Sequence, residues 1–331
     1  MLARLLGIWS KGPPAHTWEE AAPRLFPRLR DASYLDLATL RAGNRSYAPV
    51  ARAVAPGLFV TLVVDDESSM TNVSAHMLTR WRKRFDAALA RARQNLLSVS
   101  LDNFVELADG LWMAPWDDSY AASRLVLPQL LQRLTIDPLV AVPNRDTLLV
   151  ARAGSKRAVN ALTRAIENPS EPHDHPITNR LFRLREHALE PVALPAVWHH
   201  NMCVRELMQG YTYQQQLLQR HLGDKPYVAS IDADEARDGR LVTRALWTRG
   251  VDTLLPKVDR VHLLHPEERE GEAISSRMWV VAWDDLVAMR AIAPTKHHLH
   301  RYRTGRFPNA EAIKRCAIPI ERDHRTAELS V

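Results

Sequence analysis

The amino-acid sequence predicts an α+β fold arranged in two domains. Residues 57–64, GLFVTLVV, form a β-branched run that starts after Pro56, which is typical of a buried strand. An apolar stripe from Trp81 to Leu96 recurs at helical spacing and predicts an amphipathic helix. The chain has 331 residues, the length of about two typical domains.

The composition is that of an ordinary folded protein. Apolar residues make up 46% and charged residues 25% of the chain, so it can bury a core without disulfides or metals. Cys203 and Cys316 form no C-x-x-C pair, which argues against a disulfide scaffold and fits a reducing compartment. The sequence has no run of about 18 apolar residues, and its N-terminal apolar stretch is too short for a signal peptide. We therefore expect a cytoplasmic protein that does not enter a membrane.

Strand and helix patterns alternate along the first half of the chain. Residues 1–45 are rich in proline, and we expect an N-terminal extension of irregular structure with one or two short helices. Ser74 is the expected N-cap of the helix after the 57–64 strand, because its hydroxyl can accept a free N–H group. The other elements expected in this half are strands at 104–107, 111–114, on either side of a 143–146 turn and at 181–185, and helices at 120–134 and 156–167.

A domain boundary is expected near Pro191, after a Pro-rich loop. The first domain then covers residues 46–191, and a second α+β domain covers 192–291. The elements expected in the second domain are helices at 204–222 and 284–290 and strands at 227–231, 241–246, 260–264 and 278–282. Its acidic segment 232–239 fits a hairpin turn better than a calcium loop, because Ala236 stands where a ligand belongs.

Three segments carry a resemblance to a known family. They are residues 118–124, DSYAASR, residues 140–150, VAVPNRDTLLV, and residues 175–178, HPIT, leading into Leu181 and Phe182. Together they make residues 46–191 similar to the YtpQ-like bacterial family of unknown function. The resemblance implies an α+β fold and no particular activity. The family often has an acidic residue at the position of Ala121, so no role of that carboxylate carries over.

Two groups of polar residues are candidate sites in the first domain. Asp65 and Asp66 end a predicted strand, and with Asp118 they suggest a Mg²⁺-dependent hydrolase or nuclease, because hard cations prefer oxygen ligands. The alternative is a solvated turn. The second group suggests an anion or substrate site, or else a helix cap with an Arg124–Asp146 ion pair; its members are Ser123, Arg124, Asn144 and Asp146.

The net charge of +6 is concentrated in the C-terminal segment, residues 292–331. Residues 292–325 carry eight Lys or Arg and three Asp or Glu. Basic and aromatic side chains neutralise phosphates and stack on bases, so this segment is a candidate for nucleic acid or another polyanion through Lys296, Arg301, Tyr302, Arg303 and Arg306. The alternative is a solvated tail, or one docked on an acidic patch of its own protein.

The common catalytic signatures are missing from the sequence. It contains no phosphate-binding Gly-rich loop, no G-x-S-x-G elbow and no H-E-x-x-H helix, and its histidine pairs lack metal-ligand spacing. We therefore expect no metal site, and the sequence specifies no cofactor. The leading hypothesis is a non-catalytic binding or accessory protein with a protein partner; the alternatives are the hydrolase and the nucleic-acid-binding protein.

Overall fold

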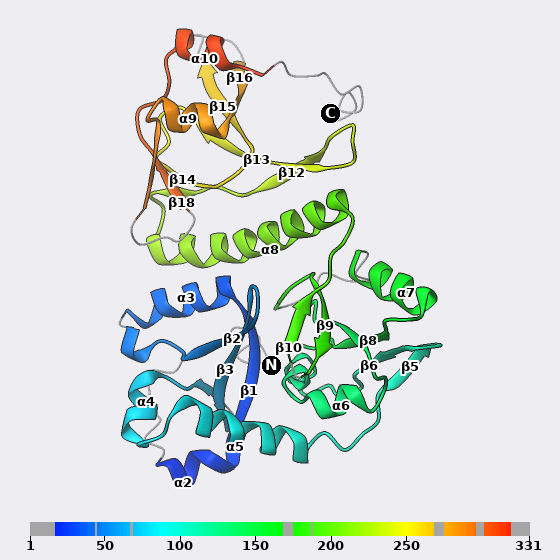
Figure 1. Cartoon of the computed structure of the whole chain (residues 1–331). Helices are drawn as coiled ribbons and strands as arrows, with labels where there is room; N and C mark the ends of the chain where they lie inside the picture. Colours follow the sequence, from blue (N-terminus) through cyan, green and yellow to red (C-terminus); the bar gives the residue numbers. More distant parts are fainter. Residues whose placement is uncertain are drawn as a thin grey trace, which may run out of the picture. The chain divides into compact units, whose positions relative to one another are not determined.

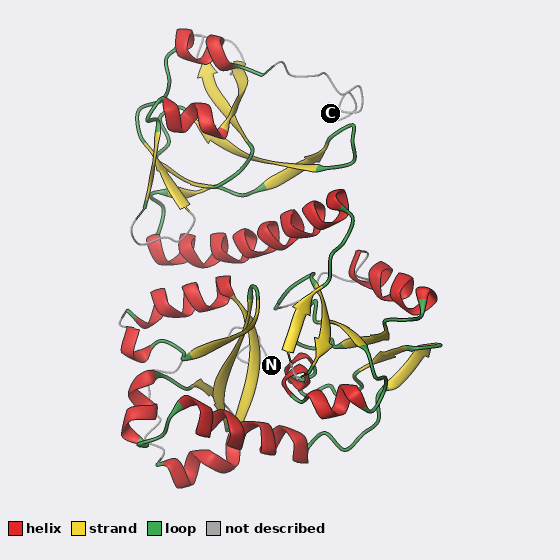
Figure 2. Ribbon diagram, viewed as in Figure 1, coloured by secondary structure: helices red, strands yellow, loops and turns green. Residues whose placement is uncertain are grey.

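The computed structural model describes residues 17–43, 45–66, 69–167, 175–186, 188–267, 275–295 and 301–318. Helices and mostly antiparallel sheets make up this part of the chain, which confirms the predicted α+β class (Figure 2). The chain divides into two compact units, Met1–Pro195 and Ala196–Val331 (Figure 1). Among the helices in the described ranges, none is long and apolar enough to cross a membrane.

The first sheet of the N-terminal unit is built around a strand that the sequence predicts. This strand, β3 (Leu58–Asp65), lies between β1 (Leu25–Asp31) and β2 (Ala51–Ala55), and it also pairs with β4 (Met70–Asn72). Its side chains are buried on both faces of the sheet, because β-branched and aliphatic residues occupy successive positions.

Of residues 1–45, residues 1–16 and 44 lie outside the described part of the chain; the rest contains the short helices that were expected, but the expectation of otherwise irregular structure there is wrong, because it also contains β1. β1 pairs with β3 along its whole length, with Leu25 opposite Val64 and Asp31 opposite Leu58. A strand that contains Pro27 is tolerated here because β1 is at the edge of the sheet, where one side of the backbone needs no ladder bond. Short helix α2 (Trp18–Ala21) precedes β1, and α3 (Ala32–Ala42) follows it.

The single helix predicted after Ser74 is two helices, α4 (Ala75–Arg80) and α5 (Phe85–Ser98). Ser74 caps α4 as expected, since its hydroxyl accepts a hydrogen bond from the Met77 N–H at 3.3 Å. The break falls at Arg82, whose φ of +53° cannot continue a right-handed helix. The apolar stripe nevertheless stays on one side, and α5 packs against β1 and β3.

The second sheet of this unit is antiparallel, in the order β10–β9–β7–β8–β6–β5. Its strands are β5 (Val105–Ala108), β6 (Leu111–Met113), β7 (Pro138–Ala141), β8 (Leu149–Arg152), β9 (Leu181–Arg185) and β10 (Ala188–Pro191). Helix α7 (Lys156–Glu167) has the predicted range. The helix predicted over 120–134 is instead a 3₁₀ turn, η3 (Ala122–Val126), followed by α6 (Pro128–Gln132), because Pro128 keeps Leu127 out of the helical region.

The C-terminal unit begins with α8 (Ala196–Leu222) and contains two sheets. One sheet has the order β12–β13–β15–β16 and the other β11–β14–β18–β17. The strands are β11 (Tyr227–Val228), β12 (Asp232–Glu235), β13 (Leu241–Thr248), β14 (Thr253–Pro256), β15 (Arg260–Glu267), β16 (Ser275–Ala282), β17 (Ile292–Pro294) and β18 (Arg301–Thr304). Antiparallel β12 and β13 form the hairpin expected around the 232–239 segment. Helices α9 (Trp283–Ala288) and α10 (Ala310–Cys316) complete the unit.

Candidate anion-binding site

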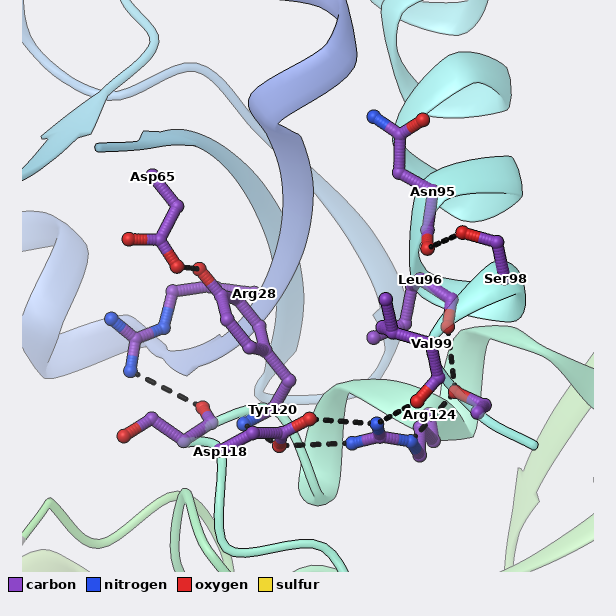
Figure 3. A network of polar contacts seen from close by, with 11 residues as sticks. Arg28, Asp65, Asn95, Leu96, Ser98, Val99, Asp118, Tyr120 and Arg124 are labelled. Carbon is purple, nitrogen blue, oxygen red and sulfur yellow. Dashed lines mark hydrogen bonds and ion pairs between the residues drawn. The ribbon is translucent and has the colours of Figure 1, made fainter. Parts of the chain in front are cut away.

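Arg124 does not form the ion pair with Asp146 that the sequence suggests. Its guanidinium is fully buried and makes a two-point contact with Asp118, from Nη1 to Oδ1 at 3.0 Å and from Nη2 to Oδ2 at 2.7 Å (Figure 3). Asp118 lies in the turn just before η3, so its carboxylate reaches Arg124 across a few residues of chain. Asp146 accepts from its own neighbour, Arg145, at 3.1 Å.

The remaining contacts of Arg124 are also internal. Its Nε donates to Ser100 Oγ at 2.7 Å, Nη2 donates to the Val99 carbonyl at 3.3 Å, and the guanidinium carbon lies 4.0 Å from the centroid of the Trp116 ring. These contacts tie η3 to the end of α5, as Figure 3 shows. Arg124 therefore has the environment of a structural cation whose charge and donors are already matched.

Ser123 and Asn144 are likewise engaged in backbone contacts. Ser123 Oγ accepts from the Leu29 N–H at 3.2 Å, so it occupies the open edge of β1. Asn144 Oδ1 accepts from the Asp146 N–H at 2.8 Å, which closes a turn of the kind that asparagine side chains favour. The anion site composed of Ser123, Arg124 and Asn144 is therefore not assembled in the described residues.

The three candidate carboxylates have different partners. Asp65 accepts a hydrogen bond from the Tyr120 hydroxyl at 2.7 Å, Asp66 forms an ion pair with Arg24, and Asp118 is held by Arg124. Within the described ranges, no group of three or more His, Cys, Asp or Glu side chains is placed to hold a metal ion. The convergence that a metal-dependent hydrolase requires of these carboxylates is thus not seen.

Two arginines on β1 form a different cationic cluster, which the sequence reasoning missed. Arg28 and Arg30 are two residues apart on a strand, so their side chains point to the same face of the first sheet. They are only 5% and 8% exposed. A buried charge is costly unless an opposite charge or a full set of hydrogen bonds compensates it, so the partners of these guanidinium groups decide their role.

Arg28 has weak partners for a buried cation. Its Nη2 donates to the Ser119 carbonyl at 3.3 Å (Figure 3), and Nη1 contacts the thioether sulfur of Met70, a weak acceptor. The guanidinium carbon is 5.4 Å from the centroid of the Tyr120 ring. Its Nε is buried and has no hydrogen-bond partner among the described residues.

The buried guanidinium of Arg30 has even fewer hydrogen-bond partners. Its Nη1 makes a long contact of 3.4 Å with the carbonyl of the preceding residue, Leu29, and its Nε is buried without a partner in the described part of the chain. Its guanidinium carbon lies 4.2 Å from the centroid of the Tyr34 ring. The Tyr34 hydroxyl accepts from Asn72 Nδ2 at 3.0 Å, and Asn72 Oδ1 is a further buried atom for which the described residues offer no partner.

No carboxylate is among the side chains with the largest effects on the pKa of Arg28. Burial is the largest cause that lowers the pKa of Arg28 from 12.5 to about 9, followed by repulsion from Arg30; Arg145 also lowers it. The ionisable side chains with the largest effects on this pKa are two arginines and two tyrosines, and none is a carboxylate. Because a pKa of about 9 leaves the group charged at pH 7, the site carries an uncompensated positive charge.

The neighbouring tyrosine adds no negative charge. Burial, then the hydrogen bond to Asp65, raises the pKa of Tyr120 above its ordinary value of 10, so its hydroxyl stays protonated at neutral pH. Arg145 is half-buried, with 23% of its side chain exposed, and Met70 is 38% exposed. These two residues mark where the cluster of Arg28, Arg30, Tyr34, Asn72, Tyr120 and Arg145 approaches the surface. The name arginine pocket is used below for these six side chains taken together.

A buried arginine in the C-terminal unit has more hydrogen-bond acceptors than Arg28 or Arg30. Arg301 is 1% exposed, and it donates to three backbone carbonyls, those of Ala229 at 2.6 Å, Tyr211 at 3.2 Å and Leu254 at 3.4 Å. Each side-chain nitrogen of Arg124 has an acceptor, whereas Arg301 Nε is buried without one among the described residues, and burial lowers the pKa of Arg301 to about 10. Arg301 still has three backbone acceptors, whereas in the described residues Arg28 has one carbonyl and one thioether and Arg30 has one carbonyl.

The other C-terminal candidates also belong to the folded unit, where described. Arg301 lies on β18, an internal strand of its sheet. Tyr302 packs edge-on against Trp283, with ring centroids 4.9 Å apart, and Arg303 donates to Asp252 at 2.6 Å and 3.0 Å. Arg306 is exposed, and Lys296 lies outside the described residues. Residues 292–295 and 301–318 are therefore not a solvated tail.

A weak signal for the arginine pocket is present in the sequence. In residues 25–31, LFPRLRD, Arg28 and Arg30 stand on either side of Leu29, and this short alternation is the spacing of a strand with two arginines on one side. The proline conceals this pattern, and the pairing with β3 that buries the arginines is a long-range contact. Comparison with protein-family models, curated proteins and solved structures gave no match.

Proposed function

We propose that the chain is a non-catalytic binding protein whose N-terminal unit binds a small anion at the arginine pocket. One observation carries this proposal. Arg28 and Arg30 are buried side by side on β1, and no ion pair to either is found in the described residues. A bound anion would supply the missing charge and acceptors for both Nε atoms.

The energetic argument uses the depressed pKa of Arg28. A decrease from 12.5 to about 9 corresponds to about 5 kcal/mol of destabilisation of the charged form, at 1.36 kcal/mol for each tenfold change. A cost of this order is a large part of the 5–15 kcal/mol that typically stabilises a domain. Strongly shifted pKa values cluster at functional sites, so this cost supports a ligand site.

The chemistry of the donors favours a phosphate or carboxylate group. A guanidinium is planar and its N–H groups match two oxygens of either anion. Arg28 and Arg30 offer two such groups, and Arg145, which is paired with Asp146, lies near enough to lower the pKa of Arg28. Tyr34 and Tyr120 place aromatic rings against the two buried guanidiniums, which holds their planes in position.

The proposal is tested by titrating inorganic phosphate into the full chain in a calorimeter at constant ionic strength. We expect one phosphate site in the native chain and at least tenfold weaker binding in Arg30→Gln, because a hydrogen bond to a charged group contributes about 1.5–3 kcal/mol. Arg157→Gln is the matched control. It makes the same charge change at an exposed position of α7 and is expected to bind like the native chain.

Equal phosphate affinity in the native chain and in Arg30→Gln would show that the pocket is not the site. Binding that weakens equally in Arg30→Gln and Arg157→Gln would point to general charge attraction instead. Both results would overturn the proposal.

The proposal also includes a cytoplasmic location and an accessory role beside a protein partner, both of which rest on the sequence. The family resemblance over residues 46–191 remains a prediction of the same kind. No arrangement among the described carboxylates favours the hydrolase. The basic side chains of β18 are buried or paired, so they give nucleic-acid binding no specific support.

A further inference from the structure

A groove of about 590 Å³ lies in the N-terminal unit, away from the arginine pocket. Four segments line it: β2, the second half of α5, η3 with the start of α6, and the β9–β10 pair. β2 and β10 are edge strands of the two sheets, and they lie side by side (Figure 1). The volume is within the range of small-molecule sites, about 300–1,000 Å³.

The groove lies on the opposite face of the first sheet from the arginine pocket. Arg52 of β2 pairs with Val60, and Val60 pairs with Leu29 of β1. Cross-strand partners share a face of a sheet, so Arg52 and Leu29 are on one face. Arg28 and Arg30 flank Leu29 and point to the other face. A ligand in the groove is therefore independent of an anion in the arginine pocket.

The interior of the groove is apolar. The side chains that give it this character are Val54, Leu97, Leu125, Val126, Leu127, Leu184 and Leu189. Val54, Leu97 and Leu189 are only partly buried although they pack against the core. Covering their exposed surface with an alkyl chain contributes about 25 cal/mol for each Å² removed from water.

The charged residues at the groove are both basic. Arg52 already has partners, because it forms an ion pair with Asp86 and its guanidinium carbon lies 5.2 Å from the centroid of the Phe85 ring. Arg93 is exposed, and among the described residues its side chain has no hydrogen bond or ion pair. No lining residue is acidic. The groove thus combines an apolar interior with one cation that is available at its rim.

We propose that this groove binds a free fatty carboxylate, with its alkyl chain along the leucine side chains and its carboxylate at Arg93. The apolar residues match the chain, and a guanidinium matches a carboxylate through two parallel hydrogen bonds. The head group is a single small anion, because Arg93 is the lining cation that forms no ion pair within 4 Å in the described part of the chain, and its attraction to Asp86, which is paired with Arg52, acts over a longer distance.

The test is calorimetric titration of the full chain with decanoate below its micelle concentration. We expect binding of one decanoate, no binding of acetate, and about tenfold weaker decanoate binding in Arg93→Gln. Gln129→Trp places a large ring at the groove from an exposed position of α6 and is expected to abolish binding. Gln132→Trp, exposed on the same helix but outside the groove, is the matched control and should bind normally.

Absence of decanoate binding would overturn the inference, as would equal binding by the native chain, Arg93→Gln and Gln129→Trp. Retention on phosphatidylglycerol vesicles without binding of free decanoate would also overturn it, because the surface would then recognise a membrane. Arg28 and Arg30 are intact in all these variants. Their phosphate response therefore separates a failure here from a failure of the arginine pocket.

Discussion

Replacement of Asp118 by alanine tests whether Arg124 is the structural cation that its contacts indicate. Asp118 supplies the carboxylate in an otherwise enclosed environment, since Arg124 is 0% exposed. After the replacement, the guanidinium keeps the Ser100 hydroxyl, the Val99 carbonyl and the Trp116 ring, and it loses its counter-charge. The Tyr120 N–H also loses the acceptor that it has at 2.9 Å.

The magnitude follows from the burial of the two partners. Removing one partner of a fully buried ion pair typically costs about 3–5 kcal/mol. The Asp118 side chain is 35% exposed, so water can partly solvate Arg124 once the carboxylate is gone. We therefore expect Asp118→Ala to lower the free energy of unfolding by about 2–3 kcal/mol. The double variant with Arg124→Met should be more stable than the sum of the single effects by at least about 1 kcal/mol.

The assay is urea denaturation followed by circular dichroism and fitted with one transition for each compact unit. Only the transition of the N-terminal unit should move, so the second transition is an internal control. A loss of less than about 0.5 kcal/mol in Asp118→Ala, or additive effects in the double variant, would refute this reasoning.

Three further predictions concern stability. Arg301→Met should lower the free energy of unfolding of the C-terminal unit by about 2–3 kcal/mol in urea, because three carbonyls lose their donor; an unchanged midpoint would contradict this. Gly110→Ala should cost about 1–2 kcal/mol in thermal unfolding, since φ is +77° there and the added Cβ would lie 3.4 Å from the Arg152 Cβ; a neutral effect would count against it. The hydrogen bond from Arg303 holds the pKa of Asp252 below its usual value in the folded chain. The ionised Asp252 therefore stabilises the fold at a pH above its pKa in the unfolded chain, and this stabilisation is lost as the pH falls through its pKa in the folded chain. Asp252→Asn should therefore remove a small part of the acid sensitivity, under about 1 kcal/mol because both side chains are exposed, and an identical pH–stability curve would argue against it.

The sequence predicted correctly the strands and helices that depend on short stretches of neighbouring residues. β3 is a β-branched run after a proline, and α7 has a strong amphipathic pattern, so both were found. The break at Arg82 was missed because Trp81 keeps the apolar stripe continuous across the turn. β1 was missed because its burial depends on pairing with a strand about 30 residues away, and because Pro27 argues against a strand.

At the candidate site, too, the sequence indicated which polar residues matter but not which partners they contact. Asp118 and Arg124 were recognised as polar candidates, but the sequence suggested Asp146 as the partner of Arg124, which is wrong because the partner depends on where η3 packs. Arg301 was interpreted as part of a basic tail, whereas it is buried by long-range contacts with α8, with β14 and with the residue that follows β11. Charge counts along a chain do not distinguish a solvated arginine from a buried one, and only the fold brings out the contrast with Arg28 and Arg30.

The most direct test of the arginine pocket is the free energy of unfolding of the native chain and of Arg28→Met, each measured without and with phosphate at constant ionic strength. Even buried ion pairs can be replaced by well-packed apolar side chains at no cost or with a gain of about 1–4 kcal/mol, and a buried cation without a counter-charge has less stabilisation to lose. Binding to the native state adds stability that rises with the logarithm of ligand concentration. We expect Arg28→Met to be at least as stable as the native chain without phosphate and to lack the extra stabilisation that phosphate gives the native chain. A variant that is destabilised by more than about 1 kcal/mol and still gains the full phosphate stabilisation would contradict the claim that Arg28 is held in place for an anion.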